Sequence, residues 1–194
     1  MRKYHVRGKS SRVAARGVLV QLSRAECTTR DGSGISMNTS YCDKWWYSRK
    51  KAIKEIDADS ARLRHANRKT YAALLGGSKQ PRHVIDIAGK WVSVAFMDKR
   101  LRQYLRYDFK NVSPGRLFLK STTYWQYKDE TDVEVSRNIF SFLEDGRILI
   151  EEHDSDTGLV RQRETIADSK PNWEEYPDFG DYSALCKEER VGEL

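Results

Sequence analysis

The fold is decided by residues 84–168, which begin VIDIAGKWVSVAFMDKRLRQYLRYDF (84–109) and continue through RLFLKSTTYWQY (116–127). Apolar and polar residues alternate in this stretch, and a period of two places successive side chains on opposite faces of a β-strand. We therefore predict a strand at 116–127. One of its faces is predicted to carry Leu117, Leu119, Ser121, Thr123 and Trp125.

The same pattern predicts six strands in this stretch. They lie at 91–97, 103–109, 116–127, 133–143, 147–153 and 159–166. Gly and Pro turn signals between them, as in Ser113-Pro114-Gly115, are typical of hairpin connections. Because hairpins join strands that are neighbours in a sheet, we predict an antiparallel meander that curls into a small barrel or half-barrel.

The chain has 194 residues, which fits one domain with an appendage or two small domains that share a core. Hydrophobic residues make up 39% of the chain and charged residues 32%, so we expect a folded protein with a thin core or a large solvated part. We predict an α+β fold in three parts. These are a basic arm and long helix at 1–83, an antiparallel β domain at 84–168 and an acidic, aromatic segment at 169–194.

A long helix is predicted at 48–75. No Gly or Pro interrupts this segment, it is rich in Ala, Lys, Arg and Leu, and Gly76-Gly77 follows it. Apolar residues recur at intervals of three and four, although Ser60 and Asn67 make the stripe partly polar. The glycines and Pro81 predict a linker at 76–81 and a domain boundary there.

Charge is strongly polarised along the chain. Residues 1–83 hold 19 Lys or Arg against 6 Asp or Glu, whereas residues 129–194 hold 7 against 19. The first 16 residues carry six cations and no acid, which is typical of an arm that orders on phosphates. Two interpretations stay open: the basic portion faces a polyanion such as nucleic acid, or the two portions neutralise each other within the chain or an oligomer.

Aromatic and basic residues stand side by side in the N-terminal part. Trp45-Trp46-Tyr47 comes just before three cations, an arrangement that suits stacking on unpaired bases or, equally, packing of a helix against a core. The predicted nucleic-acid contacts are Arg7, Lys9, Arg12, Trp45, Trp46, Arg49, Lys50, Lys51, Arg62, Arg64, Arg68 and Lys69.

The segment Ile87-Ala88-Gly89-Lys90-Trp91, which opens the meander, resembles the Gly-x-Trp motif on the first strand of lipocalin-like (calycin) barrels. The resemblance covers residues 84–168. In that family the Trp closes one end of the barrel and an Arg from a late strand packs over it, so the resemblance implies this role for Arg161 or Arg163. It also implies a barrel whose mouth holds a small apolar ligand or whose interior is simply packed.

The segment 169–194 interleaves aromatic and acidic residues. We predict that its aromatic side chains dock on the β domain or on the basic half and leave the carboxylates displayed. A second hypothesis is that it grips the basic surface of a partner. The predicted partner contacts are Trp173, Glu174, Glu175, Asp178 and Asp181.

Candidate catalytic groups concentrate in one place, Glu151-Glu152-His153-Asp154. Within a strand, Glu151 and His153 share one face, but a charged hairpin end is the plainer explanation of the cluster. No local signature supports a nucleophile with a base. We therefore predict no catalytic residue, no metal site and no cofactor.

The cysteines and the hydropathy of the chain bear on its compartment. Cys27, Cys42 and Cys186 are odd in number and contain no Cys-x-x-Cys pair, so we expect neither a disulfide framework nor a zinc knuckle. No run of about eighteen apolar residues and no signal peptide is recognisable. We predict a cytoplasmic protein without a membrane partner.

The leading hypothesis is a non-enzymatic nucleic-acid or nucleoprotein-binding factor that uses its basic arm and helix, with RNA or DNA as the partner. The alternative is a small β-barrel ligand-binding or inhibitor protein that grips a basic partner through its acidic C-terminal surface. An enzyme of unknown chemistry around Glu151 and His153 is the third.

Overall fold

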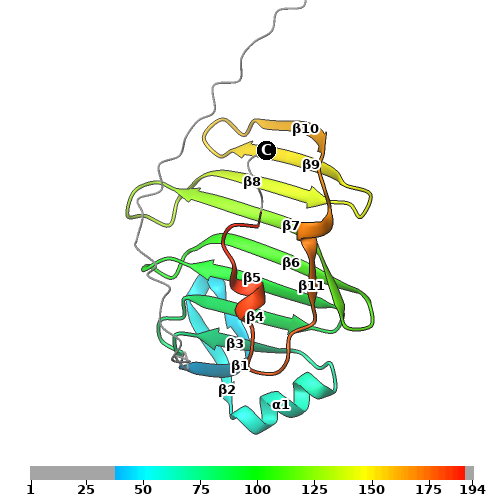
Figure 1. Cartoon of the computed structure of the whole chain (residues 1–194). Helices are drawn as coiled ribbons and strands as arrows, with labels where there is room; N and C mark the ends of the chain where they lie inside the picture. Colours follow the sequence, from blue (N-terminus) through cyan, green and yellow to red (C-terminus); the bar gives the residue numbers. More distant parts are fainter. Residues whose placement is uncertain (1–37, 191–194) are drawn as a thin grey trace, which may run out of the picture. The chain divides into compact units, whose positions relative to one another are not determined.

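The computed structural model describes residues 38–190, which form one antiparallel sheet with a single α-helix (Figure 1). The sheet order is β10-β9-β8-β7-β6-β5-β4-β3-β1-β2, and β11 pairs with the start of β7. The strands are β1 (Thr39–Trp46), β2 (Lys51–Ile56), β3 (Tyr71–Leu75), β4 (His83–Ala88), β5 (Trp91–Met97), β6 (Gln103–Ser113), β7 (Arg116–Tyr127), β8 (Glu134–Phe142), β9 (Arg147–Asp154), β10 (Val160–Ile166) and β11 (Trp173–Glu175). The helices are α1 (Ala58–Ala66) and three short 3₁₀-helices, η1 (Tyr47–Arg49), η2 (Lys170–Asn172) and η3 (Ser183–Cys186).

The predicted antiparallel meander is confirmed. β5 and β7 have the predicted bounds, and β6, β8, β9 and β10 contain most of the residues predicted for them. The turn chemistry explains this agreement. Gly146 has a φ of 92°, and a Cβ at this position would lie 2.6 Å from the carbonyl oxygen of Ala167, so only glycine fits the turn between β8 and β9.

The predicted barrel is not confirmed, because the sheet formed by residues 38–190 stays open. Its two edges are β2 and β10, at opposite ends of the strand order. Each strand from β3 to β9 lies beside the strand that follows it in the sequence, so these strands cross the sheet in chain order (Figure 1).

The helix predicted at 48–75 is wrong. This segment contains β2, the short helix α1 and β3. The backbone has a positive φ at Lys50 and at Arg68, which lie before β2 and between α1 and β3. Asp57 caps α1, because its side chain accepts a 2.7 Å hydrogen bond from the backbone N–H of Ser60. β3 is buried along its whole length and pairs with β1 and β4.

The segment predicted as a linker, 76–81, connects β3 to β4, which are neighbours in the sheet. The backbone N–H of Arg82 donates to the carbonyl of Leu75 over 2.7 Å and closes this connection. The predicted basic arm at 1–16, with Arg7, Lys9 and Arg12, lies outside the described residues. Within residues 38–190, no helix has the length and apolar character that a membrane crossing requires.

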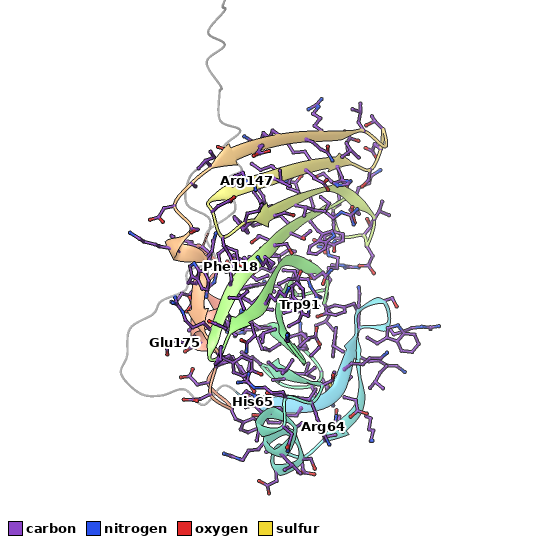
Figure 2. The ribbon with its side chains drawn as sticks, turned by 90° about the vertical axis from the view of Figure 1, so that its right-hand side faces the viewer. Arg64, His65, Trp91, Phe118, Arg147 and Glu175 are labelled. Carbon is purple, nitrogen blue, oxygen red and sulfur yellow. The ribbon has the colours of Figure 1, made fainter. Side chains whose placement is uncertain are left out.

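The two faces of the central strands are covered by different segments of the chain. We call one the core face; it carries Ile85, Val94 and Tyr107 and packs against the C-terminal segment 173–190. We call the other the groove face; it carries Val84 and Ala95 and packs against the β1–β2 hairpin. Figure 2 shows the C-terminal segment and the hairpin on opposite sides of the sheet.

The docking of the C-terminal aromatic residues, predicted from the sequence, is confirmed. Tyr182 and Leu185 are buried in the core face, and the hydroxyl of Tyr182 is 2.9 Å from the hydroxyl of Tyr71 on β3. The guanidinium of Arg190 forms an ion pair with Glu174 and lies 5.3 Å from the ring centroid of Phe109. The segment is therefore fixed by apolar, hydrogen-bonding and ionic contacts together.

A β-bulge in β7 changes the face assignment predicted for this strand. Phe109 of β6 pairs with Leu119, but the preceding Asp108 pairs with Ser121, so Lys120 is the extra residue. Leu119 is therefore buried in the core face, whereas Ser121 points to the groove face. The prediction that both residues share a face is wrong for this reason.

The C-terminal segment should contribute measurably to stability. Replacing Leu185, which is fully buried, by Ala should lower the free energy of unfolding by about 2–5 kcal/mol, because the change leaves a cavity under η3. Urea unfolding followed by tryptophan fluorescence measures this. The matched control is Leu63→Ala on α1, where the leucine is 66% exposed and the change should be below about 0.5 kcal/mol. Equal effects of the two substitutions would contradict the docked arrangement.

Candidate functional site

A row of small and acidic side chains crosses the groove face from strand to strand. Cross-strand pairing joins Asp86 to Ser93, Ser93 to Asp108, and Asp108 to Ser121. Because directly opposed residues of antiparallel strands point to the same face, these side chains form a line across β4 to β7. They lie in a groove of about 590 Å³. Its lining residues are Thr70, Asp86, Ala88, Trp91, Ser93, Arg106, Asp108 and Ser121.

Asp108 is the centre of the hydrogen-bond network in the groove. Its Oδ1 accepts a 2.6 Å bond from the hydroxyl of Ser93 and a 2.9 Å bond from Nε of Arg106. Its Oδ2 accepts a 3.3 Å bond from the hydroxyl of Ser121. The network therefore holds Arg106 in place through Nε, while its two terminal nitrogens donate no hydrogen bond to any described residue.

Asp86 connects the groove to the β1–β2 hairpin. The hydroxyl of Tyr47 donates a 2.8 Å bond to Oδ2 of Asp86, and the guanidinium of Arg106 lies 5.8 Å from the centre of the Tyr47 ring. Burial raises the pKa of Asp86, and the bond from Tyr47 and the charge of Arg106 only partly oppose this rise. Oδ1 of Asp86 accepts no hydrogen bond from the described residues, so the groove contains a carboxylate oxygen that is available to a ligand.

Trp91 forms the rim of the groove. Its side chain is 43% exposed, and Nζ of Lys110 on β6 lies 5.9 Å from its ring centroid. The role that the lipocalin-like resemblance implies for this residue is not confirmed, because Trp91 lies on an open sheet (Figure 2, where it is labelled). A lysine from the next strand takes the place expected for Arg161 or Arg163.

The tip of the hairpin brings together three of the predicted nucleic-acid contacts. Trp46 is 43% exposed, and the cationic groups of Arg49 and Lys51 lie 5.6 Å and 5.9 Å from its ring centroid. Trp45, by contrast, is buried in the core of the groove face. Lys50 is held by Asp132 in the turn between β7 and β8, with Nζ 2.7 Å from Oδ2, and this ion pair fixes the position of the tip.

The predicted contacts on and after α1 are mostly engaged within the chain. Arg62 lies over Phe179 at 4.8 Å, and Arg68 lies over Tyr176 at 3.5 Å. Arg64 pairs with Asp43 on β1 at 2.6 Å. Lys69 is exposed. Arg62 and Arg68 thus contact aromatic rings of the C-terminal segment and Arg64 pairs with β1, and none of the three forms an ion pair with an acid of residues 129–190.

The predicted partner contacts of the C-terminal segment divide into two groups. Trp173 packs edge-on against Phe118, and Glu174 forms ion pairs with Arg190 and Lys187. Asp181 accepts a 2.7 Å bond from the hydroxyl of Ser183. Glu175 and Asp178 are exposed, and a partner contact at these two residues stays a prediction.

The acid–base cluster at the end of β9 has the expected arrangement. Glu151 and His153 share a face, and Nε2 of His153 lies 3.3 Å from Oε2 of Glu151. The carboxylate of Glu151 also accepts a 2.8 Å bond from the side-chain amide of Gln162 on β10. Within residues 38–190, no group of three His, Cys, Asp or Glu side chains is arranged to hold a metal ion.

The groove residues were missed by the sequence interpretation, although a signal for them exists. Asp86 interrupts the apolar run VIDIA (84–88) and Ser93 interrupts WVSVAF (91–96), at positions where a doubly buried strand normally carries an apolar residue. A single polar residue in such a run is a reason to look for a polar partner on the neighbouring strand. Here that partner is Asp108.

No family model, curated protein or solved structure matches the chain.

The raised pKa of Asp86 should make stability depend on pH. Because the folded-state pKa lies above the ordinary value of 3.8, protonation of Asp86 stabilises the fold, and this contribution is lost as the pH rises through the folded-state pKa. Asp86→Asn, which is neutral at every pH, should therefore become more stable relative to wild type as the pH rises from about 4, until the difference levels off.

Urea unfolding at a series of pH values measures this difference. Asp129→Asn, at an exposed position in the turn between β7 and β8, is the control and should follow the wild-type profile. A stability of Asp86→Asn that falls relative to wild type as the pH rises would show that burial does not raise the pKa of Asp86.

Proposed function

We propose that this chain binds single-stranded nucleic acid across its groove face and the tip of its β1–β2 hairpin, and that it does so without catalysing a reaction. The observation that carries the proposal is a pair of tryptophans, Trp46 and Trp91, each 43% exposed and each with a cationic side chain 5.6–5.9 Å from its ring. Base–aromatic stacking contributes about 1–3 kcal/mol per base, and a neighbouring cation can contact the phosphate.

Tyr47 connects the hairpin tip, which carries Trp46, to the groove that Trp91 lines. Trp46 is followed in the chain by Tyr47, whose hydroxyl contacts Asp86 in the groove that Trp91 lines. An open antiparallel sheet that presents aromatic rings and cations is a well-suited platform for unpaired bases, because each base can stack flat on a ring while its edge meets polar groups of the sheet. Paired bases in a duplex offer no such free face.

The charge distribution favours the same surface. Residues 38–128, which form β1 to β7, hold 20 Lys or Arg against 7 Asp or Glu, whereas residues 129–190 hold 7 against 18. Since the meander keeps the sequence order from β3 to β10, cations predominate at the end of the sheet that carries the groove and the hairpin. Such a field attracts a polyanion. The basic arm at 1–16 is a further predicted phosphate contact.

The predicted cytoplasmic location belongs to this proposal, since nucleic acid is accessible there. The alternative function, an inhibitor that grips a basic partner, rests on Glu175 and Asp178, the two predicted acidic contacts that are exposed and whose carboxylates accept no hydrogen bond from the described residues. The same binding experiment separates the two functions.

The test is fluorescence anisotropy with labelled single-stranded RNA, single-stranded DNA and a duplex of the same sequence, titrated with the full chain at about 50–200 mM salt. We expect single strands to bind more tightly than the duplex, with an affinity that falls steeply with salt. Trp46→Ala should weaken binding by about fivefold or more, the value of one lost stacking contact. The double substitution Arg49→Gln, Lys51→Gln should reduce the slope of log K against log salt by about one to two units.

The control removes two cations from the acidic end of the sheet. Arg161→Gln, Lys170→Gln changes the net charge by the same amount but lies away from the groove, so it should leave affinity and salt slope close to those of wild type. Equal losses from both double substitutions would contradict a localised site. Absence of binding to any nucleic acid at low salt would exclude the proposed function and leave the inhibitor as the better candidate.

A further inference from the structure

We infer that the groove recognises a guanine base, which stacks on Trp91 and presents its polar edge to Arg106 and Asp86. The inference rests on the proposed function and names the base that it selects. It starts from the hydrogen-bonding groups that the groove leaves unused once its own network is complete.

The unused groups are donors on one side chain and an acceptor on another. Arg106 donates to Asp108 through Nε, which leaves the N–H groups of its two terminal nitrogens. Asp86 accepts from Tyr47 at Oδ2, which leaves Oδ1. The hydroxyl protons of Ser93 and Ser121 are both donated to Asp108, so these two side chains offer a ligand no further donor. A ligand that completes the groove therefore needs acceptors for Arg106 and at least one donor for Asp86.

Guanine has this order of groups along one continuous edge. N7 and O6 are adjacent acceptors, and N1–H and the N2 amino group are the adjacent donors that follow. Arginine pairs with O6 and N7 through its planar fork, and a carboxylate accepts from N–H groups. The two side chains that guanine needs, one guanidinium and one carboxylate, line the same groove and both contact Tyr47.

The other bases fit this pair of side chains less well. Adenine places a donor, its N6 amino group, beside N7, so it cannot accept two bonds from Arg106 on that edge. Cytosine has adjacent acceptors, O2 and N3, and an amino donor, but its single ring covers less of Trp91 and it offers Asp86 one donor group where guanine offers two. Uracil and thymine place an N–H group between two carbonyl oxygens, so they offer Arg106 no pair of adjacent acceptors. A base that leaves polar groups of the site without a hydrogen-bond partner binds much more weakly, so such a site discriminates strongly between bases.

The shape of the groove also suits a flat base. Its volume of about 590 Å³ lies within the range of small-molecule sites. Its floor consists of small side chains, including Ala88, Ser93 and Ser121, so that a planar ring can approach the sheet. Trp91 at the rim supplies the stacking surface, and the Tyr47 hydrogen bond fixes the carboxylate of Asp86.

The test uses a labelled single-stranded uridine oligomer with one central guanosine and the full wild-type chain. In one matched probe the guanosine is replaced by inosine, which lacks the N2 amino group, and in another by 7-deazaguanosine, which lacks the N7 acceptor. We expect each replacement to weaken binding by about tenfold. Asp86→Asn should abolish the difference between guanosine and inosine, and Arg106→Lys should abolish the difference between guanosine and 7-deazaguanosine.

Two substitutions of the same chemistry outside the groove serve as controls. Asp129→Asn and Arg147→Lys should keep both differences at their wild-type values. The wild-type comparison of the three probes needs no variant, so the inference stays falsifiable even where a groove variant does not fold.

A parallel titration with guanosine monophosphate separates the two proposals. If the oligomers bind but guanosine and inosine probes bind equally, the guanine site is excluded and the single-strand function stands. If guanosine monophosphate binds while no oligomer does, the guanine site stands and the single-strand function is excluded. If neither binds, both proposals are wrong.

Discussion

Strands β3, β4 and β5 are mostly buried on both faces, and this constraint determines where the rest of the described chain lies. A sheet with two apolar faces needs a covering layer on each side. The C-terminal segment covers the core face and is anchored by the contact between Tyr182 and Tyr71. The β1–β2 hairpin covers the groove face and is anchored by Tyr47 on Asp86. Neither covering segment brings the two ends of the sheet together, so β2 and β10 stay as open edge strands.

The groove follows from the limited reach of the hairpin. Where its cover ends, the apolar residues of the groove face give way to Asp86, Ser93, Asp108 and Ser121, one from each of four adjacent strands. Trp91 is exposed and gives the groove a stacking surface. Arg106 is held in place by Asp108 and gives the groove hydrogen-bond donors. Arg62 of α1 lies over the ring of Phe179 in the C-terminal segment, whereas the cations beside Trp46 and Trp91 lie next to exposed rings. The cations of the two faces therefore have different partners.

The sequence predicted the strands from 91 to 166 well, because alternation and glycine turns act locally. It failed at 48–75, where Lys50 and Arg68 adopt positive φ without a glycine to signal it, and where the apolar run of β3, YAALL, cannot be distinguished from a helix by periodicity. A closed barrel is not confirmed, because closure depends on the two edge strands meeting, which no local pattern records. Trp46, Arg49 and Lys51 lie together at the tip of the hairpin, and their contact with nucleic acid stays a prediction. The groove residues could not be predicted, because they come together only through the register of four strands. The bulge at Lys120 sets that register and has no clear signature in the sequence.

Contact between nucleic acid and the groove face can be mapped by ultraviolet cross-linking of the full chain to a labelled single-stranded oligonucleotide, followed by mass spectrometry of the cross-linked peptides. We expect cross-links on peptides that contain Trp46 or Trp91, and their loss when excess unlabelled single strand competes. Cross-links confined to β8–β10 or to the C-terminal segment 173–190, with none at Trp46 or Trp91, would contradict this expectation.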